Sequence, residues 1–259
     1  MSFFHRVMTN MICVHHLLLS IFLISERDKC SRALFKSSVR LLWAGERGHH
    51  LTTLVPNTEF AHLASDEDIA TVVTALTAKG MAAEVFENRA EARSRVFDLL
   101  PEGAEVYTAL SKTLEILGLQ EEINASSRYI QLRSQVDMLG REGRMSRTGR
   151  KLMASPEYVI GSVHAITHEG QVLIASGSGS QLAGYAFGAS HVIWVVGAQK
   201  IVRNVDEGLR RIWEYSYPLE NERMQTRYGM GSFPAKILLV QGEMPGRISV
   251  LLVKEAVGF

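Results

Sequence analysis

The sequence predicts an α/β fold in which a mostly parallel sheet is flanked by helices. From Ser65 onward, segments with the apolar period of a helix alternate with short apolar runs that are typical of strands. Residues 157–202 then hold three strand-like runs, and each run ends in small or polar turn-forming residues. Such alternation indicates crossover units, which join neighbouring parallel strands.

The first regular helix is expected to begin after Ser65. Ser65 and Asp68 have the spacing of a capping box, in which side chain and backbone satisfy each other's hydrogen bonds. An apolar stripe at helical spacing starts at Ile69, and Gly80 is suited to the position just after a helix. Residues 81–86 then form a predicted strand.

A second helix–strand unit follows directly. Asn88 is placed to cap the helix, with Glu91 three residues later. Residues 104–109 form the next predicted strand, and a short helix runs from Ser111 to about Gly118.

The remaining elements complete the predicted architecture. Residues 121–154 are polar and predicted to be helical, and Asn204 with Glu207 caps another helix. Residues 236–241 and 247–253 are two apolar runs around a Gly- and Pro-containing turn, and we expect a C-terminal antiparallel hairpin.

Composition narrows the class of protein. The chain has 259 residues, 46% apolar residues and a net charge of +1, which is enough for a substantial core and gives no reason to expect nucleic acid as a partner. Its two cysteines, Cys13 and Cys30, form no C-x-x-C motif. We therefore expect no metal, no iron–sulfur cluster or other cofactor, and a reducing cytoplasmic location.

The N-terminal region differs from the rest. Residues 11–24 are apolar but interrupted by His15 and His16, and they fall short of the roughly 20 residues that span a bilayer. Arg6 precedes them, as in a signal peptide, but no A-x-A cleavage pattern follows. We expect residues 1–60 to be a poorly structured extension of a single 63–259 domain; a membrane or export signal and an added helix are the alternatives.

Two segments are candidates for ligand contact. Ser111 and Thr113 lie between a strand and a helix, where hydroxyls and free N–H groups form an anion cradle, although one hydroxyl alone caps a helix equally well. Residues 176–181 read Ser-Gly-Ser-Gly-Ser-Gln, so Gly177, Gly179 and Gln181 could approach a ligand closely; the alternative is a flexible turn.

Two cationic residues extend this candidate site. Lys200 follows an apolar strand, where it could pair with a carboxylate or phosphate, or lie on the surface. Arg223 could make a bidentate contact to an anion or pair with Glu220.

Catalytic and metal-binding groups are less well marked. Glu169 is the candidate general base or nucleophile, with a solvated hairpin turn as its alternative. His164 and His168 are four residues apart, but in a strand that spacing is about 13 Å, too far to share an ion.

The basic run from Arg141 to Lys151 contains no aromatic residues, so it is not typical of single-stranded nucleic-acid binding. It is either a solvated helix face or a surface that attracts an acidic partner.

Several motifs, in this order and spacing, resemble the LUD domain family, the proteins similar to the LutC lactate-utilisation protein. The resemblance covers residues 63–259. The motifs that carry it are S-x-T-L-E-I-x-G-L at 111–119, A-S-P-E-Y at 154–158, G-S-V-H-A-I-T at 161–167, S-G-S-G-S-Q at 176–181, V-I-W-V-V-G-A-Q-K-I-V at 192–202, R-R-I at 210–212, the segment 218–223, and the ending at 245–259, which is similar to that of the free-standing, cluster-free members.

The resemblance implies a fold like that of ribose-5-phosphate isomerase and the CoA transferases, and a cytoplasmic bacterial protein linked to lactate oxidation. The recurring polar positions of the family fall on Ser111, Thr113, Gly161, Ala165, Thr167, Gly170, Gly177, Gly179, Gly197, Lys200 and Arg223. Because the cysteine motif of cluster-bearing members is missing, no electron-transfer centre is expected. Lys112 and His168 also depart from the family pattern, which weakens an acid–base role near His168.

The resulting functional hypothesis is a protein that binds a small anionic metabolite, namely a carboxylate, a phosphate or an acyl-CoA, at the carboxyl ends of the strands. The alternative is a non-catalytic accessory or regulatory partner of an iron–sulfur lactate oxidoreductase. The sequence decides neither whether the protein is an enzyme nor its oligomeric state.

Overall fold

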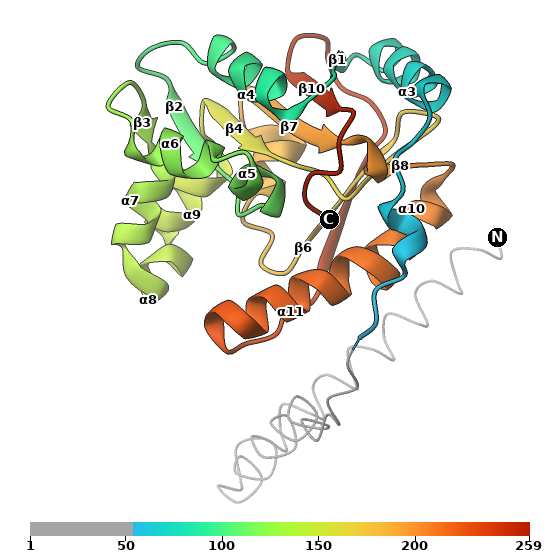
Figure 1. Cartoon of the computed structure of the whole chain (residues 1–259). Coiled ribbons are helices and arrows are strands. Elements are labelled where there is room, and N and C mark those ends of the chain that lie inside the picture. The colour runs from blue at the N-terminus through green and yellow to red at the C-terminus, as the bar shows by residue number, and fades with distance from the viewer. Residues whose placement is uncertain (1–53) are drawn as a thin grey trace, which may run out of the picture. The chain divides into compact units, whose positions relative to one another are not determined.

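Six parallel strands form the larger of two sheets in the computed structural model, which describes residues 54–259 (Figure 1). The strand order is β1-β10-β7-β4-β2-β3. Their bounds are β1 (Ala82–Phe86), β2 (Glu105–Thr108), β3 (Ile130–Gln131), β4 (Tyr158–Gly161), β7 (His191–Gly197) and β10 (Ile248–Val253). The predicted fold class, an α/β protein with a mostly parallel sheet, is confirmed.

A smaller mixed sheet has the order β8-β5-β6-β9. Strand β6 pairs antiparallel with β5 and with β9, whereas β5 and β8 are parallel. The bounds are β5 (Ala165–Thr167), β6 (Val172–Ser176), β8 (Ile201–Val202) and β9 (Lys236–Val240).

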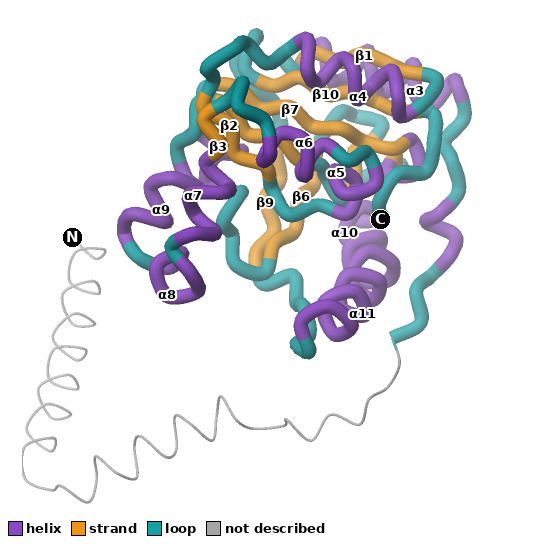
Figure 2. Tube along the Cα trace, turned by 60° about the vertical axis from the view of Figure 1, so that its left-hand side comes forward, coloured by secondary structure: helices purple, strands orange, loops and turns teal. Residues whose placement is uncertain are grey.

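Helices cover both faces of the large sheet, as Figure 2 shows in purple around the orange strands. The α-helices are α3 (Asp66–Ala78), α4 (Arg89–Asp98), α5 (Lys112–Ile116), α6 (Leu119–Ala125), α7 (Leu132–Met138), α8 (Gly140–Met145), α9 (Arg147–Ala154), α10 (Val205–Arg211) and α11 (Tyr217–Tyr228). Short helical segments are η1 (Thr58–Ala61), η2 (Gly184–Gly188), η3 (Ala198–Lys200) and η4 (Ile212–Ser216).

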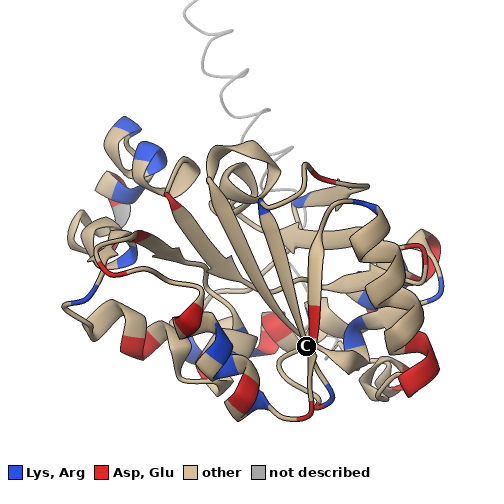
Figure 3. Ribbon diagram, turned by 90° about the horizontal axis from the view of Figure 1, so that it is seen from above, with Lys and Arg blue, Asp and Glu red and all other residues tan. Residues whose placement is uncertain are grey.

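Alternating side chains of the central strands build two separate cores. In β7, Trp194 faces a core shared with α3, α7, α9 and the small sheet, whereas Val195 faces a core shared with α4, α5 and α6. In β10, Leu252 faces the first of these cores and Leu251 faces the second. The strands contain few charged residues, and most of the charged residues belong to the helices and loops around them (Figure 3). Such two-sided burial is typical of parallel sheets.

The predicted helix starts are present. The Ser65 side chain accepts the Asp68 N–H while the Asp68 carboxylate accepts the Ser65 N–H, which completes the capping box of α3. Asn88 caps α4, and Asn204 accepts the Glu207 N–H at the start of α10.

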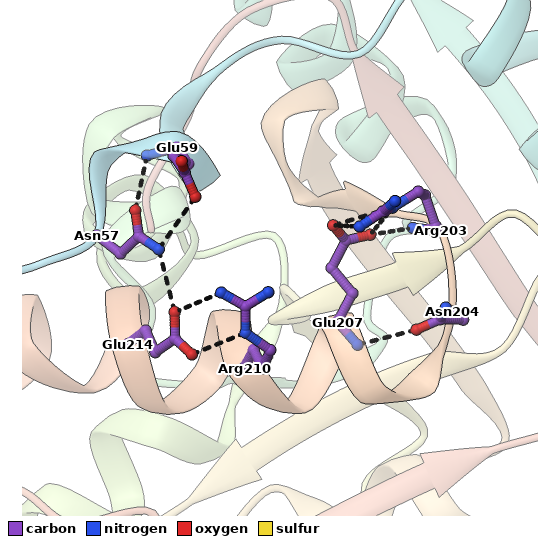
Figure 4. A network of polar contacts seen from close by, with 7 residues as sticks. All are labelled: Asn57, Glu59, Arg203, Asn204, Glu207, Arg210 and Glu214. Atoms are coloured by element: carbon purple, nitrogen blue, oxygen red, sulfur yellow. Dashed lines mark hydrogen bonds and ion pairs between the residues drawn. The ribbon is translucent and has the colours of Figure 1, made fainter.

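Polar contacts link α10 to η4, and η4 to Asn57, the residue before η1 (Figure 4). The Asn57 amide donates to the Glu214 carboxylate over 3.0 Å, and Arg210 donates to the same carboxylate over 2.8 and 3.0 Å. Arg203 and Glu207 form a second exposed pair. Phe60 of η1 is buried beside this network.

The predicted C-terminal hairpin is wrong. Strand β9 pairs with β6 in the small sheet, whereas β10 lies between β1 and β7 in the large sheet and is parallel to both. The turn residues between the two runs therefore connect two sheets. The two strands also differ in burial, since β10 is buried along nearly its whole length and β9 is mostly exposed.

The segment predicted to be helical from 121 to 154 is helical in most parts but is interrupted. It contains four separate helices, α6 to α9, and the short strand β3 between α6 and α7. Gly140, at a φ of 68°, marks one of the breaks. Residues 161–167, the turn-forming end of the first run in the 157–202 stretch, also contain a second strand, β5. This strand belongs to the small sheet, whereas β4 belongs to the large one.

Predictions for residues 1–53, including the apolar run at 11–24, Cys13 and Cys30, lie outside the described residues. Within residues 54–259, no helix is both long and apolar enough to cross a bilayer.

Candidate functional site

A cavity of about 520 Å³ lies at the carboxyl ends of three neighbouring strands of the large sheet. Ser111 follows β2, Ser162 follows β4 and Lys200 follows β7, and all three residues line the cavity. Carboxyl ends of parallel strands meet at one edge of the sheet, which is where open α/β sheets bind their ligands. The end of β6 with its Gly/Ser loop, α11 and residues 231–235 complete the wall.

Hydroxyl groups dominate the polar part of this wall. They include those of Ser111, Thr113, Ser162, Ser176, Ser178 and Ser180. Ser111 is the residue before α5, and its side chain makes no capping hydrogen bond to that helix. Its hydroxyl is therefore available to a ligand.

The cavity wall carries more cationic than anionic side chains. Its charged residues are Lys112, Arg144, Lys200 and Glu220. The Glu220 carboxylate is already held by Arg223, whose Nε and Nη2 each lie 2.8 Å from it. The Nε of Arg144 is buried and has no hydrogen-bond partner among the described residues.

Lys200 sits at the bottom of the site and is almost completely buried. Its Nζ lies 3.0 Å from Thr113 Oγ1 and 3.0 Å from Ser162 Oγ. Thr113 Oγ1 lies 3.2 Å from Ser162 Oγ and donates to the Val257 carbonyl over 3.1 Å. No carboxylate within residues 54–259 forms an ion pair with Lys200. The amine is thus surrounded by hydroxyls and not by a counter-charge.

Burial and the positive charge of Arg211 hold the pKa of Lys200 well below its usual value. Desolvation penalises the charged form of an amine, and a neighbouring cation adds to that penalty. Both effects favour the neutral form of the Lys200 amine.

Arg211 is buried behind the site and is held by oxygen atoms of neutral groups. Its Nη1 donates to the His164 carbonyl over 2.5 Å and to Ser216 Oγ over 3.2 Å. Its other nitrogens donate to the carbonyls of Gln199 and Phe60 over 3.2 and 3.4 Å. Burial lowers the pKa of Arg211 to about 10, so the guanidinium remains protonated at neutral pH.

His164 lies on the cavity wall with a fixed orientation. Its Nδ1 accepts the backbone N–H of Ala175 over 3.1 Å, which leaves the proton of a neutral ring on Nε2. Burial, together with the charges of Lys200 and Arg211, lowers the pKa of His164 to about 3. The ring is therefore neutral at physiological pH.

The Gly/Ser loop after β6 is organised by its own side chains. Ser176 Oγ accepts the Gly179 N–H over 2.9 Å and donates to Gln181 Oε1 over 3.0 Å. Gly179 has a φ of 83°, a conformation that favours glycine. The loop thus holds Gly177 and Gln181 against the cavity.

The structure brings five of the residues predicted from sequence together on the cavity wall: Ser111, Thr113, Gly177, Gln181 and Lys200. Four other predicted ligand contacts lie outside that wall. Gly161 packs against the Tyr185 hydroxyl, Thr167 bonds to Gln171, Gly179 packs against Lys236, and Arg223 pairs with Glu220 and Glu115.

Glu169, the candidate catalytic residue, is exposed in the turn between β5 and β6 and does not line the cavity. His168 likewise points elsewhere: its Nε2 lies 3.2 Å from the Asp68 carboxylate. Residues 54–259 contain no cluster of three or more His, Cys, Asp or Glu side chains suited to a metal ion.

Three site residues were missed by the reasoning from sequence. Ser162 was not selected, although it lies between Gly161 and Thr167, which were, and His164 was considered only as a metal ligand. Arg211 lies in an amphipathic helix with an equally charged neighbour, Arg210, and only the fold reveals which of the two is buried.

The fold and the cavity define an α/β protein with a polar cavity at the carboxyl edge of a parallel sheet. The LUD domain model matches residues 69–253, and the chain belongs to the LUD domain family, which is associated with lactate utilisation. The chain is also similar to a solved structure, a DUF162 family protein from Deinococcus radiodurans. The identity is 15%, the TM-score is 0.47, and the match covers 74% of this chain and 99% of the other. No curated protein matches the sequence.

Proposed function

We propose that this protein binds a small anionic metabolite, namely a carboxylate, a phosphate or an acyl-CoA, in the cavity at the carboxyl ends of β2, β4 and β7. The observation that carries the proposal is the charge of the wall. Two cationic side chains, those of Lys112 and Arg144, line the cavity together with the buried amine of Lys200. The one side-chain carboxylate of the wall is that of Glu220, and Arg223 already neutralises it.

Arg144 is the residue best suited to hold the charged group of the ligand. Its buried Nε lacks a partner, and an anion would supply one. The guanidinium stays in place through Nη2, which donates to Asp137 over 2.5 Å. The Ser111 hydroxyl and the Gly/Ser loop add neutral donors around the same cavity. Hydrogen bonds from such groups to an anion are stronger than those between neutral groups.

Association of the family with lactate utilisation makes lactate and pyruvate the first carboxylates to consider. A LutC-like role in the cytoplasm of a bacterium is part of the same proposal.

Calorimetry with lactate, pyruvate, inorganic phosphate, a phosphosugar and an acyl-CoA tests the proposal. Arg144→Gln is expected to weaken binding at least about tenfold, because a charge-assisted hydrogen bond contributes about 1.5–3 kcal/mol. Arg147→Gln is the matched control, since Arg147 is exposed on the next helix and does not line the cavity. Equal binding by the two variants, or binding of none of these compounds by the wild type, would overturn the proposal.

A second candidate function is docking on an acidic partner, such as an iron–sulfur oxidoreductase. Arg147, Arg150 and Lys151 are all exposed on α9, which favours this reading. Exposed charges are screened within about 8 Å at physiological ionic strength. A partner held by this surface is therefore released by high salt in a pull-down, and a partner retained at high salt speaks against it.

A further inference from the structure

A chain of polar contacts at the cavity wall joins Ser162, Lys200 and Thr113. Binding of an anion does not by itself require these contacts. Ser162 is half-buried and reaches the cavity, whereas Lys200 lies behind it with almost no exposed surface. The distance from Lys200 Nζ to Ser162 Oγ is 3.0 Å, and that to Thr113 Oγ1 is also 3.0 Å. A nucleophile in contact with a base that is oriented by a third group has the arrangement of a covalent catalyst.

The surroundings of Lys200 favour an amine that accepts a proton. Carboxylates of the described chain form no ion pair with it, and the nearby cation Arg211 is fixed by backbone carbonyls. In this environment the pKa of Lys200 is lowered by burial. A neutral Nζ has a lone pair that can take the proton of the Ser162 hydroxyl across the existing 3.0 Å contact.

Thr113 is a positioning residue for this pair. Because its hydroxyl proton is donated to the Val257 carbonyl, its oxygen is left to accept a hydrogen bond from Lys200 Nζ. This contact uses one N–H of the amine and leaves its lone pair free to face Ser162.

We propose that Ser162 and Lys200 act as a nucleophile and general base that transfer the acyl group of a carboxylic ester or thioester to water. The proposal rests on the proposed function, since it names the reactive class among the ligands of the same cavity. The closest general precedent is the Ser–Lys variant of serine-based acyl transfer.

The steps balance with water as the second substrate. Ser162 Oγ bonds to the acyl carbon while its proton moves to Lys200 Nζ. The bond to the leaving alcohol or thiol then breaks, and the leaving group takes that proton. Water next attacks the acyl-serine and gives a proton to Lys200 Nζ, which returns it to Ser162 Oγ as the carboxylic acid is released.

p-Nitrophenyl acetate is the probe for this step, used with the full chain. We expect release of p-nitrophenol together with an acetyl group on Ser162, which mass mapping of acid-quenched protein detects. Ser162→Ala and Lys200→Met are expected to slow the reaction at least about a hundredfold, the usual contribution of a positioned acid–base group. Ser126→Ala and Lys254→Met are matched controls, because both residues lie outside the cavity wall.

Acetyl on Lys200 or on surface lysines in place of Ser162 overturns the proposal, as does an unchanged rate in Ser162→Ala. If Lys200→Met does not fold, the position of the acetyl group and the rate of Ser162→Ala still test the proposal. Calorimetry of the wild type and of Ser162→Ala with pyruvate and phosphate separates the two proposals. If the wild type binds these anions but no acetyl-Ser162 forms, only the Ser162–Lys200 proposal is refuted. If the wild type binds neither anion, the proposed function is refuted as well.

Discussion

Gly258 lies directly against Thr113. A methyl group on Gly258 would come within 2.3 Å of Thr113 Oγ1 and 2.9 Å of the Thr113 backbone nitrogen. Since Thr113 Oγ1 contacts Lys200, a residue near the C-terminal end of the described chain holds the floor of the cavity in place.

Gly258→Ala is therefore expected to displace Thr113 and to disturb the Lys200 cluster. Gly246→Ala is the matched control, because both glycines have positive φ but the space around Gly246 is open. The free energy of unfolding should fall by about 1–3 kcal/mol more for Gly258→Ala, the usual cost of overpacking. Urea unfolding of both variants measures this difference, and equal losses would contradict the contact.

Arg211→Met is expected to lower the free energy of unfolding by about 3 kcal/mol or more. The substitution leaves buried carbonyls, including those of Gln199 and His164, without donors, at about 1–3 kcal/mol each. Arg203→Met removes an exposed ion pair with Glu207 and should change stability little. Denaturant midpoints with unchanged slopes test the contrast; similar shifts in the two variants would count against a structural role for Arg211.

Acid should destabilise the protein partly through His164. Its pKa in the folded state is about 3, below the usual 6.5, so the unfolded chain binds more protons between these values. The stability from the neutral ring is complete above about pH 6.5 and is lost as the pH falls toward 3. The slope approaches about 1.4 kcal/mol per pH unit within that window.

Comparison with His164→Gln isolates this contribution, because the other titrating groups are common to both proteins. Urea unfolding at pH 7, 6 and 5 should show a steeper loss for the wild type. Parallel pH profiles would mean that His164 titrates normally.

Ser65→Ala should cost about 1 kcal/mol of stability, since the hydroxyl accepts the Asp68 N–H over 3.1 Å at the start of α3. Thr71→Ala in the same helix removes only a bond to the Glu67 carbonyl and serves as the control. Thermal unfolding compares the two; a Ser65→Ala midpoint no lower than that of Thr71→Ala would refute the contribution of the cap.

Local signals made much of this fold predictable. Ser65, Asn88 and Asn204 mark helix starts because capping depends on residues a few positions apart. Strand pairing is different, since it depends on partners far away in the sequence. The run 248–253 is apolar at nearly every position, as expected for a strand buried on both faces. The Gly- and Pro-containing turn before it led instead to the prediction of a hairpin.

The candidate site was predictable where a residue directly follows a strand. Ser111 and Lys200 were found in this way, because loops at the carboxyl ends of parallel strands converge. Arg223 and Glu169 were chosen by residue type, but the fold pairs Arg223 with Glu220 and leaves Glu169 in solvent. Burial of Arg211 depends on tertiary packing, which no local pattern encodes.

The position of β10 has a consequence for how the chain folds. Ala82 of β1 pairs with Ser249 of β10, so the strand at one edge of the sheet joins the others only through a segment that is synthesised much later. Closing so long a loop is entropically costly and slows folding. During synthesis, β1 and α3 must therefore wait, with their apolar faces incompletely covered, until residues 248–253 leave the ribosome and enter the centre of the sheet.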